Sequence, residues 1–161
     1  MYEVDLLAHS DYMSKSLFQE SFLTCYPAFK VDFPLDVYST YDLSFNVWTV
    51  NSQEEVKCLV ELKQRRFEST KHRCTLLEKS KYDRLIELAD KMQKEEGIKC
   101  IPFYCAQFDD CYYMFNLRRV KFNIGKVNCR KTTDFEDDRI KTKEMIFIDL
   151  KEGKRYEYKG K

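Results

Sequence analysis

The sequence lacks any hydrophobic run long enough to cross a membrane. Its longest apolar stretch, Ile98 to Phe103, is interrupted by Lys99 and Pro102, whereas a membrane-spanning helix needs ~20 mostly apolar residues. The first residues are acidic, without the basic start and apolar stretch of a secretory signal. We therefore expect a cytoplasmic protein that has no membrane partner.

An excess of charge of one sign is also absent. Lys and Arg number 28 and Asp and Glu number 27, a net charge of +1, so the composition indicates no general attraction to a polyanion or a membrane surface. Binding of nucleic acid would need a local basic surface.

No Cys-x-x-Cys pair occurs among the seven cysteines. We interpret them as reduced thiols, several of them buried as small hydrophobic side chains. The spacing of Cys100, Cys105 and Cys111 matches no common zinc motif, and strand alternation puts Cys100 and Cys105 on opposite faces. The sequence therefore does not favour a zinc site.

The chain does contain enough apolar residues for one core. Its 161 residues, of which 43% are hydrophobic and 15% aromatic, exclude disordered and collagen-like classes and predict one domain over residues 1–161. Residue spacing predicts these elements: a helix over 11–25, an uncertain edge strand or loop over 29–37, a hairpin of 41–50 and 56–63, a long helix between 71 and 96, strands over 98–108 and 111–117, an unassigned 120–138, a short strand over 145–150, and a turn before 156–158.

Charged residues interrupt the second hairpin strand where burial should be greatest. Glu61 and Lys63 are two apart, so their side chains leave the same face. Antiparallel pairing brings Asp42 to the same end of the sheet, although the register is unknown. Two carboxylates and the Leu62 carbonyl would form a weak, oxygen-rich site for Mg²⁺ or Mn²⁺, with Lys63 beside it.

The long helix carries a second set of charges. At about 100° per residue, Lys81 lies in the middle of the apolar stripe, and Glu78 lies about 60° away. A charge buried without a partner costs several kcal/mol, so we expect both near Asp42, Glu61 and Lys63. The alternative is an ordinary pair on a wider polar face of the helix.

These residues, in this order, resemble the PD-(D/E)xK nuclease superfamily, specifically its small phage- and bacterial-type members. The resemblance covers about residues 12–117, leaves 118–161 as a C-terminal extension, and departs from the family at Thr40-Tyr41-Asp42, which lacks the usual Pro. It implies an α/β fold with a restriction endonuclease-like core, a central mixed β-sheet flanked by helices.

The same resemblance implies a function and residue roles. Asp42 and Glu61 would bind Mg²⁺ or Mn²⁺, Lys63 would assist the attacking water, and Glu78 or Lys81 would be the further polar residue of the helix. The expected activity is hydrolysis of phosphodiester bonds, in DNA or alternatively RNA. A catalytically inactive module that binds nucleic acid or protein is the alternative.

Substrate contact is expected from a basic run that follows the site. It comprises Arg65, Arg66, Lys71, His72 and Arg73, which could bind phosphates or could form a solvated loop. Cutting of a duplex would favour a homodimer, because two strands need two sites. We expect the tail aromatics Phe147, Tyr156 and Tyr158 at the subunit contact.

Overall fold

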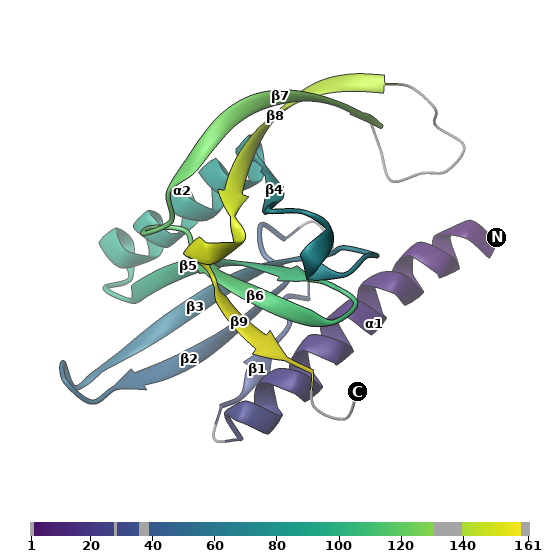
Figure 1. The fold of residues 1–161 in the computed structure, drawn as a ribbon. Helices are drawn as coiled ribbons and strands as arrows, with labels where there is room; N and C mark the ends of the chain where they lie inside the picture. Colours follow the sequence, from purple (N-terminus) through teal and green to yellow (C-terminus); the bar gives the residue numbers. More distant parts are fainter. Residues whose placement is uncertain (1, 28, 36–38, 131–139, 159–161) are drawn as a thin grey trace.

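The computed structural model describes residues 2–27, 29–35, 39–130 and 140–158. They form an α/β structure of two α-helices and two β-sheets (Figure 1). In chain order the elements are α1 (Tyr2–Cys25), β1 (Val31–Asp32), β2 (Leu43–Thr49), β3 (Glu54–Gln64), β4 (Cys74–Glu78), α2 (Lys79–Glu95), β5 (Lys99–Gln107), β6 (Cys111–Asn116), β7 (Phe122–Arg130), β8 (Ile140–Asp149) and β9 (Lys154–Glu157).

The larger sheet is mixed and has six strands in the order β1-β2-β3-β5-β6-β9. Only its β3–β5 pair is parallel, and the chain between these two strands includes α2. The predicted hairpin is confirmed as β2 and β3, and the two strands after the long helix as β5 and β6. β3 is also the central strand expected from its apolar residues, since Leu59 and Val60 are fully buried.

Different elements pack on the two faces of this sheet. Phe18 and Phe22 of α1 pack on one face, in a cluster with Val60. On the other face, residues of α2 and of the smaller sheet, Leu85 and Ile146 among them, pack with Leu59. Because side chains alternate along a strand, Glu61 and Lys63 share the face of Leu59.

The prediction of one helix over 71–96 is wrong in its first part. α2 begins at Lys79, and residues 74–78 form strand β4, which pairs with β8. Thr75 and Leu77 are buried while their neighbours are half-buried, the alternation of a strand. The partner strand lies about 70 residues away along the chain, so local periodicity could not reveal it.

The C-terminal residues are part of the fold rather than an appendage. β7 and β8 form a hairpin, here called the arm, which joins β4 in the smaller sheet with order β4-β8-β7. The short strand expected over 145–150 is thus the end of a strand that begins at Ile140. β7 occupies much of the unassigned 120–138, of which 131–139 lie outside the described residues.

Two further expectations concern short segments. Of the uncertain 29–37 stretch, only Val31–Asp32 forms a strand, and residues 36 and 37 lie outside the described part. The expectation that Tyr156 and Tyr158 lie at a subunit contact is wrong for Tyr158, which is buried in this chain's own core beside α1. Neither α1 nor α2 combines the length and apolar character of a membrane span.

Asp110, in the turn between β5 and β6, holds the loop that follows β3 in place by hydrogen bonds. Its carboxylate accepts hydrogen bonds from the Ser69 backbone N–H and hydroxyl, both at 2.6 Å. These bonds outweigh the opposing effect of burial and lower the pKa of Asp110 to about 2.

Replacing Asp110 with alanine should reduce the free energy of unfolding by about 1–3 kcal/mol. The reason is that Ser69, which is buried, would keep two donors without acceptors. Urea unfolding measures the change, and Asp32→Ala, which removes an exposed carboxylate from β1, is the control. Equal stabilities of the two variants would contradict this account.

Candidate active site

The antiparallel register of β2 and β3 answers the question that the sequence left open. Leu43 pairs with Val60, and the Asp42 N–H donates to the Val60 carbonyl at 2.8 Å. Asp42 thus lies just before β2 and next to β3, close enough for its charge to act on Glu61. The Asp42 carboxylate also accepts a hydrogen bond from the Leu62 N–H at 2.6 Å, which fixes its position beside β3.

Glu61 is a buried acid, only 3% exposed. Its Oε1 accepts a hydrogen bond from the Lys81 ammonium in an ion pair. Burial, together with the negative charge of Asp42, raises the pKa of Glu61 to about 7, against the opposing effects of Lys81 and Lys63. Asp42 and Glu61 are therefore close enough for their charges to repel each other.

Lys81 reaches this acid from the first turn of α2. Burial by itself would lower the pKa of Lys81, but the charge and hydrogen bond of Glu61, with the charges of Asp42 and Glu78, raise it. Leu85, one turn further along α2, is fully buried. The expectation of a lysine on the apolar side of this helix is thus confirmed.

Lys63 and Glu78 complete the cluster. Partial burial and the positive charges of Lys81 and Arg65 lower the pKa of Lys63. Glu78 ends β4 instead of lying on the helical stripe. Partial burial alone would raise its pKa, yet the hydrogen bond and charge of Lys143 and the charges of Lys81 and Lys63 lower it.

The structure therefore brings all five predicted residues into one network of interacting charges. Asp42 lies just before β2, Glu61 and Lys63 lie on the adjacent β3, and Glu78 and Lys81 come from the junction of β4 and α2. The network lies on the α2 face of the large sheet. This juxtaposition of three acids with two lysines can position a phosphate, a cation or a water molecule.

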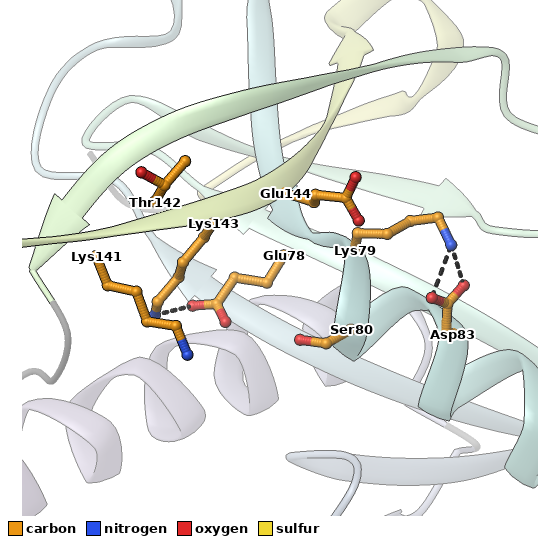
Figure 2. A pocket seen from close by; sticks show the side chains of 8 residues that line it. All are labelled: Glu78, Lys79, Ser80, Asp83, Lys141, Thr142, Lys143 and Glu144. Carbon is orange, nitrogen blue, oxygen red and sulfur yellow. Dashed lines mark hydrogen bonds and ion pairs between the residues drawn. The ribbon is translucent and has the colours of Figure 1, made fainter.

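Sequence reasoning missed Lys141 and Lys143, which descend from β8 toward Glu78 (Figure 2). The Lys143 ammonium lies 2.9 Å from a Glu78 oxygen, and both lysines line a hollow of ≈ 320 Å³ at the start of α2. The alternation Lys141-Thr142-Lys143 before an apolar strand was the available signal. Its meaning depends on the pairing of β8 with β4, which is not local.

The basic run does not act as one surface. Arg65 points inward, where its Nη2 donates to the Leu76 carbonyl and, at 3.1 Å, to the Tyr104 hydroxyl. Arg73 pairs with Asp149 at 3.2 Å, at the end of β4 remote from the site. Four of the predicted substrate-binding residues are exposed between β3 and β4: Arg66, Lys71, His72 and Arg73.

The donor set can be tested against a divalent cation. Among the described residues no group of three or more His, Cys, Asp or Glu is placed to hold a metal ion, and the cysteines are free thiols. Asp42 and Glu61 nevertheless provide the hard oxygen ligands that Mg²⁺ prefers, typically one or two carboxylates with water. A cation would also relieve the repulsion that raises the pKa of Glu61. The acid pair therefore fits such an ion, and ligation by the Leu62 carbonyl stays a prediction.

Comparisons with protein-family models, curated proteins and solved structures found no match to this chain. Membership of the PD-(D/E)xK superfamily therefore stays a prediction. The function has to be argued from the geometry of the site itself.

Proposed function

We propose that the protein is a divalent-metal-dependent nuclease that hydrolyses phosphodiester bonds, most readily in DNA, on a restriction endonuclease-like core. The observation that carries the proposal is the half-buried Asp42 beside the buried Glu61, with Lys63 on the same strand face as Glu61. The order of elements supports it, because a helix, the hairpin β2–β3, a crossover through α2 and the strands β5 and β6 follow one another as the resemblance implies.

Hydrolysis forms a bond between a water oxygen and phosphorus and breaks the bond from phosphorus to the leaving oxygen, which takes up a proton. Asp42 and Glu61 would hold Mg²⁺ or Mn²⁺, which when bound lowers the pKa of water and offsets phosphate charge. Lys63 would orient the attacking water and stabilise the charge that develops on the phosphate. Lys81 is a positioning residue, because its ion pair holds Glu61.

The test is incubation of the purified protein with linear, branched and single-stranded DNA and with RNA, in Mg²⁺, Mn²⁺ or EDTA. We expect cleavage at millimolar metal and none in EDTA. Asp42→Asn should abolish cleavage, since the amide keeps an acceptor for the Leu62 N–H but loses the charge. Asp32→Asn on β1 is the control. Failure to cleave any substrate in either metal would refute the proposal.

The ion pair between Glu61 and Lys81 favours a second candidate function. An acid already neutralised by a lysine needs no metal, which suits an inactive module that keeps the fold and binds nucleic acid or protein. Calorimetry distinguishes the two functions. A nuclease site should bind Mn²⁺ weakly, with a millimolar dissociation constant that Asp42→Asn weakens further, whereas the inactive module should show no such binding.

The arm lysines should contribute to substrate binding in the proposed function. Lys141 and Lys143 line the hollow beside Glu78 (Figure 2), so Lys141→Gln should weaken DNA binding and reduce the salt dependence by about one phosphate contact. Lys126→Gln is the matched control. Lys126 lies opposite Glu144 in the strand register, so its side chain is on the face of the arm that is opposite to Lys141 and Lys143. Binding titrations at several salt concentrations measure both. An equal loss in the two variants would contradict a specific contact.

A homodimer stays a prediction of the proposed function. Tyr158, which we expected at its contact, packs inside the chain. Sedimentation velocity at increasing protein concentration measures the association. A monomer at every concentration would contradict the predicted homodimer and would leave the proposed roles of the site residues unchanged.

A further inference from the structure

A second hollow, here called the aromatic groove, lies beside the candidate active site. It has a volume of ≈ 280 Å³, and its walls include Arg65, Phe67, His72, Leu76, Phe108 and Phe147. Phe108 is buried, while Phe67 and Phe147 are half-buried. Concave sites lined by rings with a few placed polar groups are typical of sites for flat organic ligands.

The rings are held in place by their neighbours. Phe67 packs edge-on against Phe108, with centroids 5.7 Å apart, and against His72 at 4.9 Å. Phe147 lies over Gly125 of β7, where an added Cβ would come within 2.8 Å of the ring. The glycine therefore lets the Phe147 ring of β8 lie close to the backbone of β7, and any larger residue at position 125 must displace the ring.

Arg65 brings a positive charge to the wall of the groove. Both described hydrogen bonds of the Arg65 side chain use Nη2, and a guanidinium has five N–H donors in all, so others can serve an acceptor on a ligand. Lys71 is exposed, and its ammonium lies 5.7 Å from the centroid of the Phe67 ring of the groove. Aromatic walls with positive charge around them complement a nucleobase and its flanking phosphates.

The groove adjoins the proposed catalytic residues on two strands. Arg65 follows Lys63 by two residues, and Leu76 precedes Glu78 by two, a separation of about 7 Å along a strand. Glu61 precedes Arg65 by four residues, about 13 Å along an extended chain, so one or two nucleotides would connect a phosphate at the acid pair to a base in the groove. A base in a continuous duplex is stacked and cannot enter such a groove, whereas an unpaired base can.

We propose that the aromatic groove binds an unpaired nucleobase next to the phosphodiester held at the Asp42–Glu61 pair. Single-stranded nucleic acid, or a single-stranded stretch within a duplex, is then the substrate class. The inference rests on the proposed function and deepens it.

The test measures binding in EDTA, so that it does not depend on cleavage. Fluorescently labelled single-stranded hexanucleotides, each abasic at a different position, are titrated by anisotropy with the protein. At one position, loss of the base should weaken binding about 5- to 100-fold, the effect of removing one stacked base. Phe67→Leu and Phe147→Leu should weaken binding of the intact strand and have no further effect on the strand abasic at that position.

Two more variants complete the design. Gly125→Ala displaces the Phe147 ring without removing it, so it should also weaken binding of the intact strand and not of the abasic strand. This variant replaces a phenylalanine variant that does not fold. Trp48→Leu removes an exposed ring from β2, opposite Glu55 at the far end of β3, and should change nothing. Circular dichroism checks that each variant is folded.

The outcomes separate the groove from the nuclease. The inference is overturned if single strands do not bind, or if loss of the base at every position leaves the affinity unchanged. It is also overturned if the variants weaken binding of the intact and the abasic strands equally. Metal-dependent cleavage with any of these results would leave the proposed function standing without the groove. Base-dependent binding without cleavage in Mg²⁺ or Mn²⁺ would support the groove and refute the nuclease.

Discussion

Lys63→Ala is expected to reduce metal-dependent cleavage of DNA about 10²- to 10³-fold, the usual effect of removing one charge-stabilising donor from a transition state. Partial burial and the nearby positive charges of Lys81 and Arg65 lower the pKa of Lys63, which makes its ammonium a better proton donor. The side chain ends at the surface, so its loss should have little effect on stability. Initial rates at saturating Mg²⁺ measure the change.

Lys57→Ala is the matched control for this prediction. Lys57 lies on β3, on the same strand face as Lys63 but about 20 Å away along the strand. The two variants should unfold at similar urea concentrations, and only Lys63→Ala should lose activity. Equal cleavage rates for Lys63→Ala and the parent would mean that the lysine has no catalytic role.

The central part of the fold could be predicted because its signals are local. Alternating apolar residues identify β2 and β3, and the apolar run 58–62 marks β3 as a central strand. The two charges at Glu61 and Lys63 stand out for the same reason, since they interrupt that run. The sequence thus indicated the acid pair and both lysines before the strand register was known.

What could not be predicted depends on pairing between distant segments. β4 was taken for the start of a helix because Leu77 also fits a helical period, and its partner β8 is about 70 residues away. The arm has exposed apolar residues at Ile124 and Ile140, so the pattern of its apolar residues gives only a weak period. Lys143 and the groove ring Phe147 both belong to β8, and for that reason neither was assigned to the site.

Glu61 should make the metal-free protein less stable as the pH rises from about 5 to 8. Its pKa in the folded protein is about 7, above the ordinary value of 4.5, because of burial and the charge of Asp42. Between these values the folded state binds more protons than the unfolded state, so the free energy of unfolding falls with increasing pH and levels off above 7. The shift corresponds to about 3 kcal/mol.

Glu61→Gln isolates this contribution, because the amide has the same shape, can accept the Lys81 hydrogen bond and does not titrate. Urea unfolding in EDTA at pH 5.5 and 8.5 should show a decrease of about 2–3 kcal/mol in the parent that is absent from the variant. Parallel stability profiles for parent and variant would show that Glu61 ionises as an ordinary acid, and that it does not share a buried, repulsive site with Asp42.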